Sequence, residues 1–138
     1  MRSWWLPLEY RRIWTVLSIA LVATVIYGSL APAGVDLVQD IGDKWQHGTT
    51  YFVLAAWFAG LAPRRNYPWI VSGLLLLGFS LELLQYAMAE EHIADSHRVA
   101  DPRDMAANTA GIIVGMIAAY VGLGTWAVRV EAWLSRGT

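Results

Sequence analysis

Four long runs of apolar residues, separated by short polar stretches, dominate the chain. They cover residues 13–31, 44–62, 68–88 and 102–126. A helix needs about 20 apolar residues to cross a hydrocarbon core about 30 Å thick, because each residue rises about 1.5 Å. The pattern therefore predicts an all-α fold. We expect an integral membrane bundle of four transmembrane helices, formed by a single domain over residues 1–138.

The cations of the chain are distributed unequally between the two sides of this predicted bundle. The side with both termini carries seven, which are Arg2, Arg11, Arg12, Arg64, Arg65, Arg129 and Arg136. The opposite side carries Lys44, Arg98 and Arg103. Positive charge favours the cytoplasmic side of a membrane. We therefore predict an N-in/C-in topology, with the loops 32–43 and 89–104 on the outer side.

Both ends of the chain combine Trp, Leu and Arg, a mixture typical of segments at a membrane–water interface. We expect Met1–Arg12 to form a short amphipathic helix there and residues 127–136 to extend the last helix. Indole rings also favour this interface. A belt of six tryptophans is predicted on the cytoplasmic side, namely Trp4, Trp5, Trp14, Trp69, Trp126 and Trp133.

Composition narrows the possible functions. Hydrophobic residues make up 57% of the chain and charged residues 15%, against about 25% charged in an ordinary soluble domain. The net charge of −1 argues against a nucleic-acid partner, which would require a basic face. The chain has no cysteine, so disulfides and thiolate chemistry are excluded.

Polar residues occur near the outer ends of three predicted helices. Within each helix they are three or four residues apart and share one face. They are Asp43, His47 and Tyr51 in the second helix, Glu82 and Gln85 in the third, and Asp104 and Asn108 in the fourth. A carboxylate that faces lipid costs at least ~2.5 kcal/mol. We therefore expect these groups to point inward and to meet at one level, in the outer half of the membrane.

In the functional interpretation, the polar residues form a site for an anionic molecule. The predicted catalytic residues are His47 as a base, with Glu82 or Asp104 setting its tautomer. The predicted substrate contacts are Lys44, Tyr51, Gln85, Arg98 and Asn108, with the cations holding an anionic head group. Any hydrolysis would use an activated water.

A divalent ion bound by Asp43, His47, Glu82 and Asp104 is a less favoured alternative. No strict metal-ligand spacing is present, so we predict no metal site, and nothing indicates a cofactor. In the structural interpretation, the pairs Asp43–Lys44, Arg98–Asp104 and Glu82–His47 only hold the bundle together. Asp101 is then a helix cap, and Gln85 and Asn108 make hydrogen bonds between helices.

The fourth predicted helix also carries a stripe of small residues. Ala107, Gly111, Gly115 and Ala119 recur every four residues. Such a stripe allows two helix backbones to approach closely. We therefore expect this helix to cross a neighbour tightly, and a contact between two copies of the chain is an open alternative.

The order of the polar residues resembles the VanZ-like family. The resemblance rests on Asp43-Lys44-x-x-His47-x-x-x-Tyr51, then Glu82-x-x-Gln85, then Arg98, Asp104, Asn108 and Gly111. It covers Asp43 to about Gly115, and the first helix and both tails match only in hydropathy. The family consists of small multi-span membrane proteins without an established activity, and its founding member is associated with low-level teicoplanin resistance.

The resemblance implies a multi-pass protein of the bacterial cytoplasmic membrane that contacts membrane lipids. The expected function is to bind or act on an anionic cell-envelope or lipid-linked molecule, with or without catalysis. The alternative is a non-catalytic structural or interaction protein.

Overall fold

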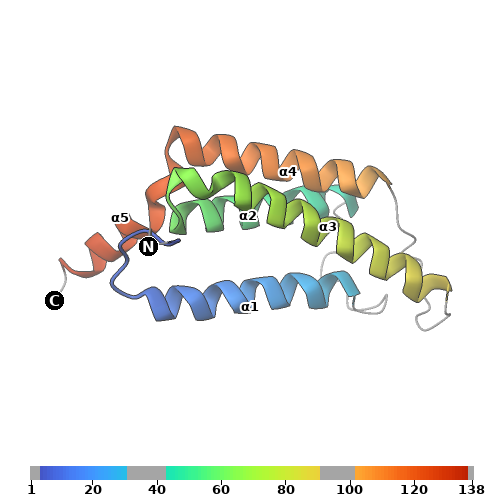
Figure 1. The fold of residues 1–138 in the computed structure, drawn as a ribbon, viewed down its shortest axis with the longest axis horizontal. Coiled ribbons are helices and arrows are strands. Elements are labelled where there is room, and N and C mark those ends of the chain that lie inside the picture. The colour runs from blue at the N-terminus through green and yellow to red at the C-terminus, as the bar shows by residue number, and fades with distance from the viewer. Residues whose placement is uncertain (1–3, 31–42, 91–101, 137–138) are drawn as a thin grey trace.

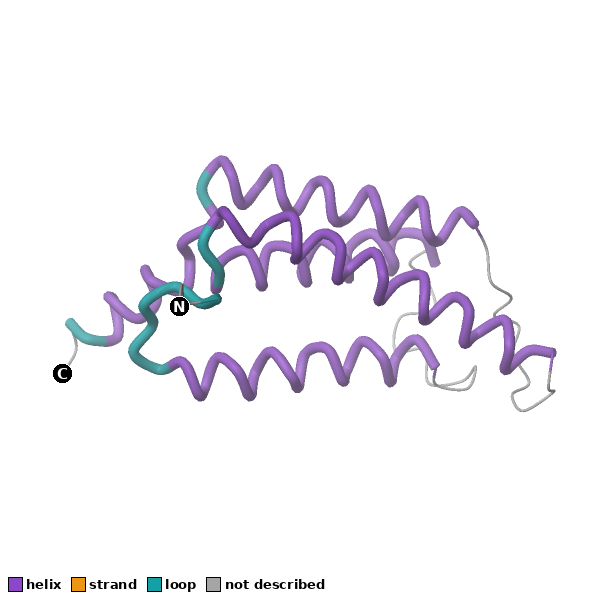
Figure 2. Tube along the Cα trace, viewed as in Figure 1, coloured by secondary structure: helices purple, strands orange, loops and turns teal. Residues whose placement is uncertain are grey.

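The fold is all-helical over the residues that the computed structural model describes, which are 4–30, 43–90 and 102–136 (Figures 1 and 2). The α-helices are α1 (Arg11–Leu30), α2 (Asp43–Leu61), α3 (Tyr67–Glu90), α4 (Pro102–Val121) and α5 (Trp126–Leu134). Short 3-10 helices precede α3 (η1, Arg64–Asn66) and α5 (η2, Leu123–Thr125). Helices α1 to α4 lie side by side, whereas α5 leaves the end of the bundle that holds both termini.

Each of the four predicted helices is present, but two predicted extensions are wrong. The fourth helix was expected to run to residue 126, whereas α4 ends at Val121. Two weak helix formers, Gly122 and Gly124, follow this end. The break directs Trp126 towards α2, where its indole Nε1 donates to the carbonyl of Ala56 at 3.1 Å. The predicted N-terminal amphipathic helix is also absent, because residues 4–10 are not helical.

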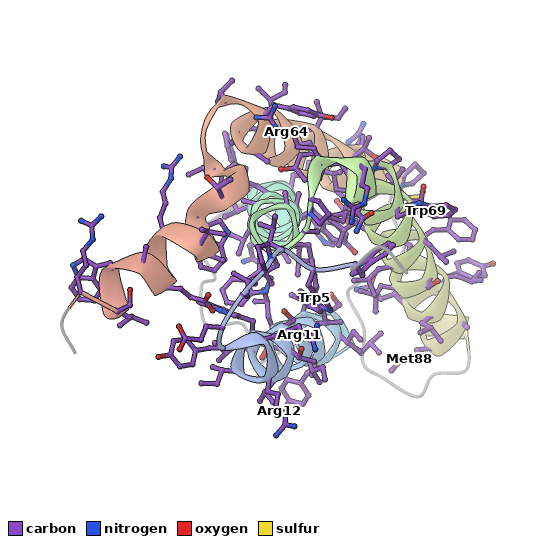
Figure 3. All side chains as sticks on the ribbon, turned by 60° about the vertical axis from the view of Figure 1, so that its left-hand side comes forward. Trp5, Arg11, Arg12, Arg64, Trp69 and Met88 are labelled. Carbon is purple, nitrogen blue, oxygen red and sulfur yellow. The ribbon has the colours of Figure 1, made fainter. Side chains whose placement is uncertain are left out.

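Among the residues that the structure describes, three helical segments are long and apolar enough to cross a membrane, which indicates a membrane protein. They are Arg11–Leu30, Arg64–Met88 and Pro102–Val121. The helix α2 is not among them, because its first turns contain Lys44, Gln46 and His47. However, α2 lies in the middle of the bundle and packs against α1, α3, α4 and α5 (Figure 3). Its neighbours therefore partly cover Gln46 and His47, whereas Lys44 stays exposed.

The closest helix crossing in the bundle joins α2 to α4. Gly111 lies directly against the backbone carbonyl of Gly48. One turn further on, Gly115 lies against Ala55 and the carbonyl of Phe52. The predicted tight crossing through the small-residue stripe is thus confirmed, and its partner is α2. Since α2 already covers this stripe, it is not a free surface for a second copy of the chain.

Three tryptophans pack together at the end of the bundle that holds both termini. Trp14 meets Trp57 and Trp126 edge to face, with ring centroids 6.0 and 5.3 Å apart. Trp14 is buried, so the predicted interfacial belt is wrong for Trp14, and Trp126 packs inward beside it. Trp4, Trp69 and Trp133 are exposed, as a belt requires.

A carboxylate of α5 fastens the two ends of the chain to each other. Glu131 accepts hydrogen bonds from the backbone N–H groups of Glu9 (2.8 Å) and Tyr10 (3.0 Å) and from Nε1 of Trp14 (2.7 Å). It thereby satisfies donors that precede the start of α1. Burial raises the pKa of Glu131, but these three hydrogen bonds outweigh burial and leave the pKa below its usual value of 4.5.

Because α2 and α4 cross so closely, we predict that one methyl group added at the crossing destabilises the fold. In Gly111→Ala, the new Cβ would overlap the Gly48 carbonyl, so we expect the free energy of unfolding to fall by about 1–3 kcal/mol. The control is Gly73→Ala, where nothing lies within 4 Å; it should leave stability unchanged or raise it by up to about 1 kcal/mol. Unfolding followed by circular dichroism in detergent measures both. Equal effects of the two variants would contradict the close crossing.

The Glu131 contact predicts a pH dependence of stability. Because folding lowers the pKa of Glu131, its stabilisation is complete above the unfolded value of about 4.5 and is lost as the pH falls through the lower folded value. Glu131→Gln should therefore melt below the wild type at neutral pH and lose less stability on acidification. The exposed Glu9→Gln serves as the control at neutral pH. Parallel pH profiles for wild type and Glu131→Gln would contradict this role.

Candidate functional site

Three titratable side chains converge from three different helices. His47 comes from α2, Glu82 from α3 and Asp104 from α4. One potential ligand atom of each lies within 4.8 Å of the others. Glu82 and Asp104 are each only 6% exposed. The structure therefore brings together the three residues that we predicted to be catalytic, and we call them the polar cluster.

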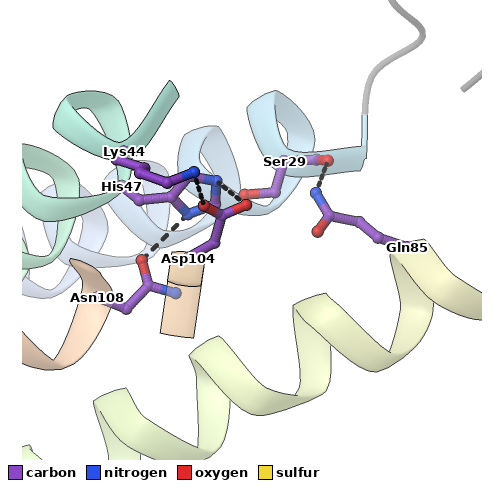
Figure 4. A network of polar contacts seen from close by, with 6 residues as sticks. All are labelled: Ser29, Lys44, His47, Gln85, Asp104 and Asn108. Carbon is purple, nitrogen blue, oxygen red and sulfur yellow. Dashed lines mark hydrogen bonds and ion pairs between the residues drawn. The ribbon is translucent and has the colours of Figure 1, made fainter. Parts of the chain in front are cut away.

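His47 makes a different contact through each nitrogen of its ring (Figure 4). Its Nδ1 lies 3.1 Å from Oδ1 of Asn108, and because an amide oxygen only accepts, Nδ1 is the donor. Its Nε2 lies 3.8 Å from Oδ2 of Asp104. Asn108 thus orients the ring and leaves Nε2 facing the carboxylate.

Lys44 lies at the outer edge of the polar cluster. Its Nζ is 3.7 Å from Oδ1 of Asp104. The lysine side chain is 51% exposed, whereas that of Asp104 is 8% exposed. An ammonium group has three N–H donors, so Lys44 can contact an anion from outside while it stays beside Asp104. The cluster is therefore buried on one side and has a cation at its mouth.

A second polar layer lies one helical turn deeper. Tyr51, Gly78 and Asn108 are each four residues from His47, Glu82 and Asp104, respectively, and lie towards the inner end of the bundle. A Cβ at Gly78 would lie 3.1 Å from Oη of Tyr51 and 3.3 Å from Nδ2 of Asn108. Gly78 thus makes room for both polar groups. We did not predict this role; its signal was the spacing of four residues from Glu82.

The Tyr51 hydroxyl is buried beside the polar cluster. The side chain is 2% exposed, and its oxygen has no hydrogen-bond partner in the described part of the chain. Leaving a hydroxyl buried without a partner costs about 1–3 kcal/mol. Such a group, next to a cluster of titratable residues, is available to a ligand.

The remaining predicted site residues lie elsewhere or cannot be placed. Nε2 of Gln85 donates to the carbonyl of Ser29 at 2.8 Å, which fastens α3 to the end of α1 (Figure 4). Arg98 and Asp101 lie outside the described residues, and so does the side chain of Asp43. Of the predicted structural pairs, Glu82 and His47 lie close together. The other two pairs, Asp43–Lys44 and Arg98–Asp104, each include a side chain outside the described part of the chain.

The arrangement supports two kinds of chemistry. His47, held by Asn108, can accept or deliver a proton at Nε2. The polar cluster also offers one imidazole nitrogen and two carboxylate oxygens, a donor set that suits a divalent transition-metal ion with an open coordination position. Asn108 would then be the outer partner that fixes the ring. Lys44 adds an anion contact at the mouth in either case.

Comparisons with protein families, with curated proteins and with solved structures find no match to this chain. Its function is therefore inferred from the geometry of the polar cluster and from the order of its residues along the chain.

The unpartnered hydroxyl predicts an unusual result for Tyr51→Phe. Removing an oxygen without a hydrogen bond should leave the free energy of unfolding unchanged or raise it by up to about 1 kcal/mol. The matched control is Tyr67→Phe, because Oη of the buried Tyr67 donates to the carbonyl of Ala59 at 3.3 Å; it should lose about 1 kcal/mol. Chemical denaturation in detergent compares the two. An equal loss in both variants would show that the Tyr51 hydroxyl is bonded within the folded chain.

Proposed function

We propose that this chain is a VanZ-like membrane protein whose polar cluster binds, and acts on, an anionic cell-envelope or lipid-linked molecule at the outer leaflet. The observation that carries the proposal is the burial of Glu82 and Asp104 beside His47, with the half-exposed Lys44 at the edge. The binding of the anion is the primary function. Proton transfer by His47 is the chemical step that the same geometry favours.

The energetic cost of the cluster supports a site over a purely structural role. Each buried ion loses several kcal/mol of hydration, and apolar residues of similar size often stabilise a fold equally well. The small-residue crossing already brings the backbones of α2 and α4 into contact. Titratable residues at such a cost are typical of functional positions within membranes.

The charges match an anionic ligand at the mouth. Lys44 is half-exposed, and Arg103 is exposed at the start of α4, beside Asp104. The carboxylate of Asp104 holds Lys44 in position. A phosphate or carboxylate head group can therefore approach from the outer surface and reach Lys44 first, then His47.

The structural alternative also has an observation in its favour. Asp104 contacts Lys44 and His47 across the α2–α4 interface, and such contacts fix the register of two helices. In that alternative, the polar cluster only specifies the bundle, and changing it would affect folding before anything else.

The proposed topology has four spans with both ends in the cytoplasm, α2 being the fourth span within the bundle. Arg11, Arg12 and Arg64 lie at the end that holds both termini, whereas Met88 lies at the other end (Figure 3). The arginines support a cytoplasmic location for the end that holds both termini. The polar cluster is then in the outer half of the bilayer, and we propose the bacterial cytoplasmic membrane as its location.

Variants of the polar cluster test the proposed function. We propose that the wild-type chain protects a bacterial host against teicoplanin, as the VanZ-like resemblance implies. We expect His47→Gln and Glu82→Gln to keep membrane yield and melting temperature but to abolish this protection. The control is Ser18→Ala, which removes the acceptor of the Trp57 indole (2.9 Å) at the opposite end of the bundle and should keep protection. If both cluster variants lose yield and stability together, the structural alternative is correct. Full protection by both would also contradict the proposal.

The proposed topology predicts the accessibility of single cysteines. Since the natural chain has no cysteine, each introduced thiol is the only target. In intact cells, Arg103→Cys should react with a membrane-impermeant maleimide, and Ser135→Cys should react only after the membrane is permeabilised. Labelling of Ser135→Cys in intact cells would contradict a cytoplasmic C-terminus.

A further inference from the structure

A groove of about 430 Å³ runs along the surface between α2 and α4. Its lining is almost entirely apolar, and Lys44 is the one charged residue among the lining residues that the structure describes. We call it the α2–α4 groove. It is lined by Lys44, Trp45, Gly48, Thr49, Phe52, Ala107, Ala110, Gly111 and Val114.

The groove is a direct consequence of the close helix crossing. Gly48 and Gly111 bring the two backbones into contact, so they form a shallow floor without side chains. Larger side chains stand on either side, and two of them, Trp45 and Val114, are 74% and 54% exposed. The lining residues of α2 extend from Lys44 to Phe52, which is about 12 Å of helix.

The groove leads to the mouth of the polar cluster. Lys44 belongs to both, because it lines the groove and its Nζ lies 3.7 Å from Asp104. An apolar channel inside a hydrocarbon core is filled by hydrocarbon, whereas an exposed ammonium group at its end attracts an anion. One molecule satisfies both requirements only if it is an amphiphile with an anionic head.

We propose that the α2–α4 groove holds one hydrocarbon chain of an anionic phospholipid whose phosphate group binds Lys44. This inference rests on the proposed function and specifies its ligand as a lipid, not a water-soluble anion. The bound phosphate lies at the mouth of the polar cluster, within the reach of His47. The groove thus selects for the lipid tail and Lys44 selects for the charge of the head.

A second copy of the chain is a poorer occupant of the groove. The small residues that would let a foreign helix approach closely are already in contact with each other across the α2–α4 crossing. The groove that remains suits a thin hydrocarbon chain, and an apolar helix would leave the Lys44 charge without a new partner. We therefore treat helix docking as an outcome of the test.

Native mass spectrometry of the full chain in detergent tests the inference, with phosphatidylglycerol and phosphatidylcholine of identical chains as probes. Ala110→Phe and Val114→Phe fill the groove without touching the polar cluster. The control is Ile117→Phe, since Ile117 is 56% exposed and Val114 54%, and Ile117 lies on the same helix but outside the groove. Two filling variants are used so that one that fails to fold can be set aside.

We expect the wild type and Ile117→Phe to bind phosphatidylglycerol alike, and the filling variants to bind it at least about tenfold more weakly. Lys44→Met should lose the preference for phosphatidylglycerol over phosphatidylcholine while it keeps the stem of the side chain.

The groove inference and the proposed anion site fail in different ways. If the filling variants bind like the wild type while Lys44→Met loses the preference, the groove inference fails and the anion site stands. If Lys44→Met also retains the preference, the proposed head-group contact fails too. A dimer that is abolished by Ala110→Phe but not by Ile117→Phe would show that the groove docks a helix of a second copy, which overturns the lipid assignment.

Discussion

The high cost of placing ionised side chains in hydrocarbon constrains this bundle more than any other interaction. Glu82 and Asp104 are tolerable only if other helices surround them, and both are buried where α2, α3 and α4 meet. The same constraint explains the position of α2. Its polar first turns exclude it from the segments that are apolar enough to face lipid, so it lies in the middle, where His47 and Tyr51 meet polar groups of α4 and α3.

The two ends of the bundle are held together by different kinds of contact. At the end that holds both termini, Glu131 joins α5 to the N-terminal segment and Trp14 by hydrogen bonds. Ring contacts between Trp14, Trp57 and Trp126 join α2 to the same group. At the other end, the polar cluster lies beside the half-exposed Lys44. It also lies beside the Tyr51 hydroxyl, which has no hydrogen-bond partner among the described residues. A firmly fastened end allows the opposite end to keep such costly groups, which a ligand can use.

The lengths of the apolar runs were sufficient to predict the four long helices, although not the end of α4. The spacings of three and four residues fixed which side chains share a face, and the cost of exposure to lipid required those faces to meet. Long-range contacts were out of reach, because nothing local links Glu131 to Glu9 and Trp14, more than a hundred residues away. Gln85 shows the same limit: its spacing from Glu82 predicted the site, but its amide nitrogen bonds to α1. The role of Gly78, which leaves space for Tyr51 and Asn108, depends on its neighbours in the folded chain.

The most direct test of the polar cluster is ¹⁵N NMR of the His47 ring in detergent, with His47→Gln to identify its signals among the three histidines of the chain. We predict a protonated Nδ1 whose signal shifts in Asn108→Ala, and an Nε2 signal that shifts in both Asp104→Asn and Glu82→Gln. If the His47 signals are the same in all three variants, His47, Glu82 and Asp104 do not form one site.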